Sequence, residues 1–260
     1  MDIINKFTRT DDTTSGIIKY DLNASERTNL LSSIPQNFRE CYISKSDLKK
    51  LCRAHGMTSK EILEQFKLPD DGKIMSGDFG EILCLLVIKS KLQMKGLRVF
   101  GIPKWRWKQE KNKAAPHSDG ILFHQKNSKV PSTDDFVVSV ESKMKAVKNN
   151  NYRPIQNAID GAQKDKLTRL AKTIVWLDQR FGLEPRPHLL KKLERFKRPD
   201  VHGTYKKHFK AIALIDSNFF DDELNAGWSN TDKDIQVIAF SISDLKGAYN
   251  GMFKSIANLS

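Results

Sequence analysis

The stretch at residues 137–145, V-V-S-V-E-S-K-M-K, constrains the fold of this chain more than any other. Its β-branched residues up to Val140 predict a buried strand. Side chains alternate between the two faces of a strand, so Glu141 and Lys143 point to the same face. We therefore expect a carboxylate and an ammonium group side by side where this strand ends.

A second acidic residue precedes another predicted strand. The segment P-H-S-D-G at residues 116–120 leads into I-L-F, so Asp119 lies beside Glu141 if the two strands pair as neighbours. Mg²⁺ takes oxygen ligands in proteins, and Mn²⁺ accepts the same donors. The pattern predicts a divalent-metal site at Asp119 and Glu141, with Lys143 next to it.

These residue types suit the hydrolysis of a phosphodiester. A divalent cation neutralises charge on the phosphoryl oxygens and supplies hydroxide near neutral pH. Lys143 would orient the attacking water or stabilise the developing charge. Acid-x-Lys occurs four times in the chain, but only the copy at Glu141 follows a buried strand that has an acid-bearing strand before it. A solvated ion pair at a strand end is the alternative interpretation.

The charge of the chain points to a polyanionic partner. Its formal net charge is +13 and its pI is about 9.5. Residues 1–75 contain 12 Lys and Arg against 11 Asp and Glu, whereas residues 76–260 contain 32 against 20. The basic excess belongs to the part with the predicted site, which favours a polyanionic partner there over a merely soluble basic surface.

Cysteine usage and hydropathy indicate the compartment. Cys41, Cys52 and Cys84 show no C-x-x-C spacing, so neither a disulfide framework nor a zinc ribbon is predicted. The first 12 residues lack the apolar core of a signal peptide, and the longest apolar run, at residues 82–88, is too short to span a bilayer. We expect a cytoplasmic protein with no membrane partner.

The N-terminal part, residues 1–71, is predicted to contain polar segments followed by two short helices. The first helix starts at Ser46 and ends at Gly56, and Thr58 with Glu61 forms a capping box for the second. Such a pair is either a DNA-reading helix-turn-helix or a helical hairpin that packs on the main domain or on a partner protein. The nearly neutral charge of this part favours docking.

A longer helix is predicted from Ser76 to about Leu92. Glu81 lies among the apolar residues of its first turns, and a carboxylate buried without a partner is costly. Glu81 therefore either forms a salt bridge or provides a third acid for the metal site, and we include it among the candidate metal ligands.

Residues 97–108 predict a strand that continues with a period of two through both tryptophans. This places Lys104, Arg106 and Lys108 together on the opposite face. These three cations, together with Lys145 on the strand of residues 137–145, are predicted to contact the nucleic-acid backbone.

The second half of the chain predicts a long helix, two strands and a closing helix. Pro154 suits a helix N-terminus, and this helix runs to about Phe181. Gln163 and Lys166 lie one turn apart on it and face either the site or water. The strands are expected at residues 209–216 and 235–242, and Ser243 is expected to cap the last helix.

The order of elements over roughly residues 76–216 resembles the PD-(D/E)xK nuclease superfamily. This resemblance implies an α/β fold in which helices flank a mixed central sheet, with a small N-terminal helical region before it. We accordingly expect a partner-docking region at residues 1–71 and a nuclease domain at residues 72–260.

The same resemblance implies roles for individual residues. Glu81, Asp119, Glu141 and Lys143 would form the catalytic set, with the three acids binding one or two Mg²⁺ ions. The Pro-Asp of the superfamily becomes P-H-S-D at residues 116–119, which leaves Asp119 in place.

Three blocks resemble HamA, the nuclease family of the Hachiman antiphage system of bacteria: S-G-D-F-G-E at residues 76–81, P-H-S-D-G at 116–120 and V-E-S-K at 140–143. This resemblance implies a helicase partner of the HamB type that restrains the nuclease until aberrant DNA is engaged. DNA is then degraded broadly and the infected cell is lost. A bacterial cytoplasmic location is implied as well.

Other functions fit the same residues. A site-specific restriction endonuclease uses the same core but needs an element that reads bases, which the sequence does not reveal. A nucleic-acid-binding subunit without catalysis would keep the fold and the basic surface. A structural adaptor for a helicase would show no metal-dependent cleavage.

Overall fold

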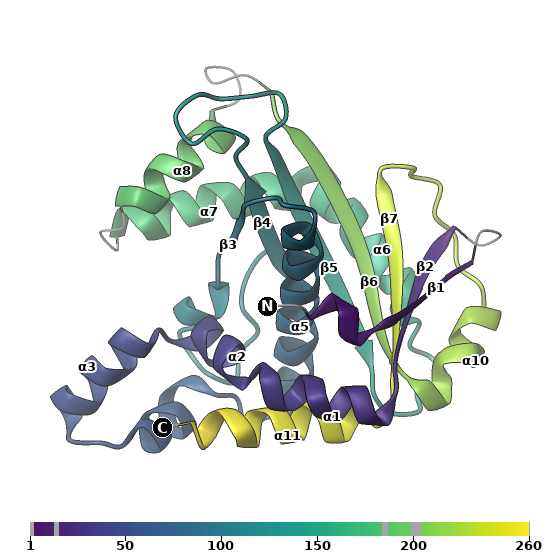
Figure 1. The fold of residues 1–260 in the computed structure, drawn as a ribbon, viewed down its shortest axis with the longest axis horizontal. Coiled ribbons are helices and arrows are strands. Elements are labelled where there is room, and N and C mark those ends of the chain that lie inside the picture. The colour runs from purple at the N-terminus through teal and green to yellow at the C-terminus, as the bar shows by residue number, and fades with distance from the viewer. Residues whose placement is uncertain (1–2, 13–15, 184–186, 199–203, 260) are drawn as a thin grey trace.

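A seven-stranded mixed sheet forms the centre of the computed structural model, which describes residues 3–12, 16–183, 187–198 and 204–259 (Figure 1). The strand order is β1-β2-β7-β6-β5-β4-β3. Four neighbouring strands are parallel, and three of them lie in the middle, namely β5 (Phe136–Lys145), β6 (Lys206–Asp216) and β7 (Ile235–Ile242). The α/β fold with a mixed central sheet is therefore confirmed.

Both edges of the sheet contain antiparallel pairs. On one side, β4 (Gly120–His124) pairs with β5, and the short edge strand β3 (Val99–Gly101) pairs with β4. On the other side, β2 (Ile17–Leu22) runs parallel to β7, and β1 (Thr8–Asp12) pairs antiparallel with β2.

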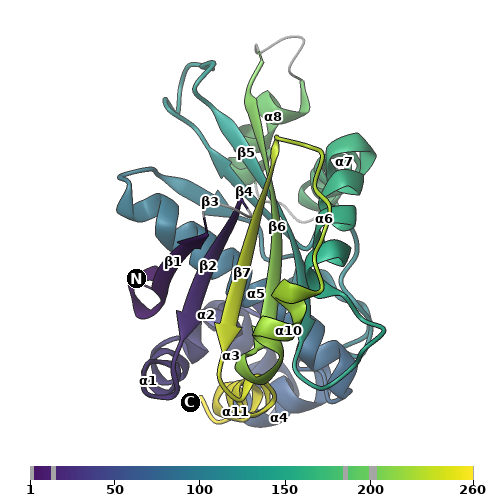
Figure 2. The ribbon, with the colours of Figure 1, turned by 90° about the vertical axis from the view of Figure 1, so that its right-hand side faces the viewer.

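Helices cover both faces of this sheet (Figure 1, Figure 2). One face packs against α5 (Gly72–Met94), and the core on this side also takes in α1 (Ala24–Ser33), α2 (Pro35–Tyr42) and α11 (Leu245–Ala257). The opposite face packs against α6 (Pro154–Lys164), α7 (Leu170–Leu183) and α8 (Pro187–Lys197). A π-helical turn, Asp165–Arg169, joins α6 to α7.

The remaining helices are short. They are α3 (Lys45–His55), α4 (Ser59–Ile62), α10 (Phe220–Asn225), a π-helical turn at Leu63–Lys67, and 3₁₀ turns at Ile4–Lys6, Lys104–Trp107 and Ser217–Phe219. No helix in the described ranges is long and apolar enough to cross a membrane.

Side chains of β5 alternate between the two faces of the sheet, so alternate residues pack against different helices. Val138 and Val140 belong to the core under α5, whereas Val137 belongs to the core under α6. Because successive side chains alternate, Glu141 and Lys143 continue the α6 side. The polar end of the strand is thereby directed toward the helix that begins at Pro154.

Several predicted helix ends are confirmed. Gly56 ends α3 in the left-handed conformation with φ 65°, and Thr58 and Glu61 form both hydrogen bonds of a capping box. Pro154 occupies the first turn of α6.

Three predicted helix starts are displaced. The N-cap of α5 is Asp71 rather than Ser76, because the Asp71 carboxylate accepts hydrogen bonds from the backbone N–H groups of residues 73 and 74. Ser44, not Ser46, caps α3, and Asp244, not Ser243, caps α11. In each case the first backbone N–H groups of the helix donate to the side chain of a residue other than the predicted cap.

The secondary structure predicted for the N-terminal 71 residues is incomplete. Residues 8–22 add two strands to the main sheet, and α1 and α2 were not predicted. Phe7 and Tyr20 pack on Phe240 of β7, each with its ring centroid 5.0 Å from that of Phe240. Residues before and after position 71 therefore share one hydrophobic core.

The predicted long strand at residues 97–108 is wrong. β3 ends at Gly101, and residues 104–107 form a 3₁₀ turn after Pro103. Proline has no N–H to donate to a sheet, so the pairing stops there.

Candidate active site

The candidate site lies where β4 begins and β5 approaches its end. The two strands are antiparallel neighbours, with Gly120 opposite Val140, so Asp119 comes beside Glu141 as predicted. The backbone N–H of Ser142 donates to Asp119 Oδ2 at 2.9 Å. Asp119 is thus fixed to β5 by a hydrogen bond.

Lys143 links the two carboxylates. Its Nζ lies 2.5 Å from Glu141 Oε1 and 3.7 Å from Asp119 Oδ2. Burial opposes the charged ammonium, but Asp119 and then Glu141 raise the pKa of Lys143 above its ordinary value. Its side chain is 30% exposed against 2% for Glu141, so the site opens to solvent at Lys143.

Glu141 is buried and held by two cations. Oε1 accepts from Lys143 and Oε2 accepts from Arg169 Nη2. Burial raises the pKa of Glu141 to about 7, and the neighbouring Asp119 carboxylate adds to the rise against Lys143 and Arg169. A group with such a pKa changes charge close to neutral pH.

Glu81 reaches the same region from α5. Its Oε2 lies 3.1 Å from Lys104 Nζ, yet this buried oxygen has no partner with hydrogen-bond geometry. Burial raises the pKa of Glu81 to about 8, and Asp119 and Asp78 add to the rise against the opposing effect of Lys104. Asp119 thus adds to the raised pKa of both glutamates.

Behind Glu141 lies a buried polar cluster whose residues are not among the predicted site residues. Asp165, from the π-helical turn, accepts hydrogen bonds from Ser139 Oγ at 2.6 Å and from Ser118 Oγ at 3.1 Å. Its Oδ1 also pairs with Arg169, which holds Glu141. Thr173 completes the cluster with an oxygen–oxygen contact of 2.9 Å to Ser118.

A sequence signal for this cluster existed. Asp165 and Arg169 are four residues apart in a helical stretch, the spacing at which opposite charges meet. The prediction for this helical stretch instead names Gln163 and Lys166 as residues that face either the site or water. Lys166 pairs with Asp232 and Asp234, so it contributes nothing to the site.

The predicted basic face at residues 104–108 is not formed. Lys104 is 5% exposed and pairs with Glu81. Lys108 Nζ lies 2.8 Å from Asp78 Oδ2, which also accepts a hydrogen bond from Tyr42. These lysines balance buried acids and do not line a surface for a phosphate backbone.

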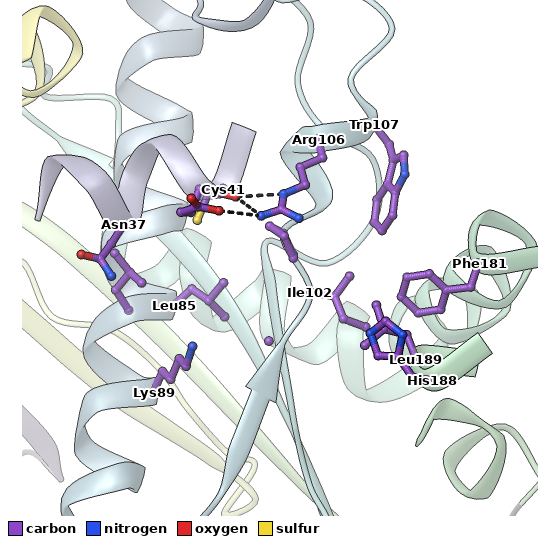
Figure 3. Close-up of a pocket in the computed structure, with 14 residues that line it drawn as sticks. Asn37, Cys41, Leu85, Lys89, Ile102, Arg106, Trp107, Phe181, His188 and Leu189 are labelled. Atoms are coloured by element: carbon purple, nitrogen blue, oxygen red, sulfur yellow. Dashed lines mark hydrogen bonds and ion pairs between the residues drawn. The ribbon is translucent and has the colours of Figure 1, made fainter. Parts of the chain in front are cut away.

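Arg106 and Lys145 also have structural partners. Arg106 Nε donates to the backbone oxygen of Glu40 at 2.9 Å, on the wall of a cavity of about 380 Å³ (Figure 3). Lys145 is buried beside Glu223, with Nζ 3.2 Å from its Oε2. The exposed basic face predicted for Lys104, Arg106 and Lys108 is therefore not formed, and Lys145 is buried as well. Contact of these four residues with nucleic acid stays a prediction.

The cavity beside Arg106 is separate from the carboxylates. It lies between α2, α5, β3 and α8, with Trp107 and His188 on its far wall (Figure 3). None of Glu81, Asp119 and Glu141 lines it.

The carboxylates of the candidate site provide the type of donor atom, oxygen, that a hard divalent cation prefers. Asp119, Glu141 and Glu81 offer oxygen donors, and Glu81 Oε2 has no hydrogen bond. Within the described residues, no three His, Cys, Asp or Glu side chains converge into a ready metal cluster. In this structure the ammonium of Lys143 supplies the positive charge between Glu141 and Asp119.

The chain was also compared with known proteins. The model of a protein family described as HamA matches residues 2–256, which is nearly the whole length. No curated protein matches the chain.

Proposed function

The chain belongs to the HamA family, and from this premise we propose that it is a metal-dependent deoxyribonuclease, the effector subunit of a Hachiman defence complex. Membership of the family supports a role in Hachiman antiviral defence. Cleavage, the metal and the helicase partner are the parts of the proposal that need experiments.

The observation that carries the proposal is the contact of Lys143 with both Glu141 and Asp119 at the solvent-facing end of β5. Two carboxylates and a lysine on adjacent strands are the groups needed to hold a hard cation and to stabilise a phosphoryl centre. Glu81 adds a third carboxylate, whose pKa is raised by burial first and then by the nearby Asp119 and Asp78 carboxylates.

Each residue of the candidate site would have its own role. Asp119, Glu141 and Glu81 would hold Mg²⁺, or Mn²⁺ in its place. When bound, this cation neutralises phosphoryl charge and lowers the pKa of a water molecule. Lys143, the most exposed member, would contact the phosphoryl oxygens or orient the attacking water. Arg169 keeps Glu141 oriented through its ion pair.

The charge of the chain supports a polyanionic substrate, and the substrate that we propose is DNA. Residues 76–260 contain 32 Lys and Arg against 20 Asp and Glu. Phosphate contacts give affinity without sequence information. Such binding fits broad degradation better than cleavage at defined sites.

A helicase partner is proposed to restrain this activity. An active nuclease that does not select sequences would damage the DNA of its own cell. The N-terminal helices, α3 and α4, are the proposed docking surface, since residues 1–75 are nearly neutral. Phe66, 56% exposed directly after α4, is a suitable contact for a partner.

The test is a cleavage assay on circular and linear DNA, with and without Mg²⁺ and with and without the partner. We expect metal-dependent cleavage that Glu141→Gln and Lys143→Met each reduce by about 10²–10⁴-fold while the protein stays folded. Lys148→Met, at an exposed lysine after β5, is the matched control and should leave cleavage unchanged. Near-normal cutting by both site variants would refute the assignment of the site.

A non-catalytic DNA-binding subunit is the second candidate. One observation favours it, namely that both carboxylate oxygens of Glu141 already have cationic partners. Under this alternative, DNA binding persists, no condition gives metal-dependent cleavage, and Mg²⁺ leaves the melting temperature unchanged.

A further inference from the structure

A cavity of about 430 Å³ lies on the α5 face of the sheet. It is an open cavity bounded by the last turns of α5, the first residues of β5, β6 and β7, and one residue each of β1 and β2, and Phe136 and Val138 line it. Glu141 points to the opposite face of the same strand. The sheet therefore separates this cavity, which we call the α5 cavity, from Glu141, and neither Glu81 nor Asp119 is among its lining residues.

The α5 cavity is strongly basic. Arg9, Lys91, Lys95, His208 and Lys210 line it, and no acidic side chain is among its described lining residues. A volume of this size is typical of small-molecule sites. The combination predicts an anionic ligand.

Two of the lysines are hydrogen-bonded to neutral groups. Lys91 Nζ donates to the Tyr20 hydroxyl at 2.9 Å, and Lys210 Nζ donates to Gln236 Oε1 at 2.8 Å. These acceptors orient the ammonium groups without cancelling their charge. Both cations are thus positioned for a further, negatively charged partner.

Lys210 occupies an unusual position. It lies on a central parallel strand, where both faces are normally apolar, and Ile212 and Leu214 on the same face are fully buried. Burial, followed by the charges of Lys91 and Lys95, lowers the pKa of Lys210 to about 8. Placing an ammonium group there costs folding free energy that a bound anion would recover.

Apart from Gln236, the other lining residues of the α5 cavity are apolar. Ile88, Leu92, Phe136 and Val138 form a floor beneath the cations. A flat, weakly polar ring can pack on such a floor while a phosphate group meets the ammonium groups.

We propose that the α5 cavity binds a nucleoside phosphate, with the base against Phe136 and Leu92 and the phosphate held by Lys91, Lys95 and Lys210. The ligand is either a free nucleotide or the 5′-phosphorylated end of a DNA strand, which offer the same chemistry. This site is independent of the proposed cleavage at Glu141.

Titration calorimetry on the full chain, in EDTA so that no metal-dependent cleavage occurs, tests the proposal. We expect dAMP to bind more tightly than inorganic phosphate. Lys91→Met and Lys210→Met should each weaken dAMP binding about tenfold or more. Lys49→Met removes the same charge from an exposed lysine of α3 and should bind as the wild type does.

Two short oligonucleotides, with and without a 5′-phosphate, distinguish the sources of the ligand. A phosphorylated strand that competes with dAMP identifies a strand end, and binding of dAMP alone identifies a free nucleotide. Thermal melts verify the fold, and Lys95→Met at an exposed position serves if Lys210→Met fails to fold. The proposal is wrong if neither ligand binds, if the lysine variants bind normally, or if a poly-glutamate peptide displaces dAMP as well as nucleotides do.

Discussion

Gly161 of α6 lies against the carboxylate of Glu141 with no room for a side chain. A Cβ at position 161 would come within 3.0 Å of Oε1, Cδ and Cγ of Glu141. The Gly161 carbonyl also accepts a hydrogen bond from Arg169 Nη2 at 2.8 Å. Helix, arginine and glutamate therefore fix one another, and the glycine makes this close approach possible.

The first prediction is that Gly161→Ala lowers cleavage by about tenfold or more, because the methyl group must push Glu141 away from Lys143 and Asp119. Circular dichroism should show that the protein still folds, and the cleavage assay measures the loss. Gly251→Ala is the control, since Gly251 also lies inside a helix but has no atom within 4 Å of its added Cβ. Equal activity of the two variants would contradict the close packing at Gly161.

The second prediction concerns the support behind Glu141. Asp165 is 1% exposed and accepts from Ser118, Ser139 and Arg169. Asp165→Asn removes the charge that balances Arg169, so we expect a loss of about 3 kcal/mol in the free energy of unfolding. Urea denaturation measures it.

The control for that experiment is Asp178→Asn, which breaks the more exposed ion pair with Lys197. Exposed pairs contribute roughly 0–1 kcal/mol, so this variant should unfold almost as the wild type does. Similar losses in both variants would show that the Asp165 cluster is not a special support.

The elements near the site can be predicted from the sequence because each is marked by a pattern of neighbouring residues. The run up to Val140, the acid at Asp119 and the helix start at Pro154 each depend on neighbouring residues, and each is found in the structure. The contact of Lys143 with Glu141 follows from the period of two along one strand.

Long-range pairing explains what sequence patterns missed. Lys104 and Lys108 look like surface cations until Glu81 and Asp78, on a helix more than 20 residues earlier, are placed against them. The Asp165 cluster likewise draws on three separate segments. The spacing of residues within one helix or strand does not indicate partners that come from distant segments of the chain.

The third prediction uses the raised pKa of Glu81. Between the ordinary value of 4.5 and about 8, folded Glu81 holds a proton that the unfolded chain has released. The unfolded state binds fewer protons in this window, so stability falls as pH rises from about 4.5 to about 8. Glu81→Gln removes this contribution, and the stability of the variant in EDTA should fall less steeply over that range.

The same variant separates the two roles considered for Glu81. If Glu81 is a metal ligand, Glu81→Gln cuts less DNA, needs more Mg²⁺ and gains less melting temperature from added Mg²⁺ than the wild type. If Glu81 only balances Lys104, the variant loses stability and keeps a normal dependence on Mg²⁺. A thermal melt beside a metal titration measures both.

The last prediction concerns the proposed partner surface. Charges at Leu48 or Ile62 cannot test it, because these side chains are 3% and 1% exposed and belong to the core. Removing residues 1–71 is equally unsuitable, since it deletes β1 and β2 from the sheet. Phe66 is the better probe because it is exposed and lies in the turn after α4.

Phe66→Asp should leave the melting temperature within a few degrees of the wild type, because an exposed side chain contributes little to the core. It should weaken co-purification with the helicase subunit and raise toxicity in cells that express both proteins, since a charge at an apolar contact opposes docking. Leu167→Asp is the matched control, as Leu167 is 79% exposed on the opposite face of the sheet. If Phe66→Asp stays fully bound and silent, the N-terminal helices are not the docking surface. Release of the partner by Leu167→Asp would instead place docking at the π-helical turn that joins α6 to α7.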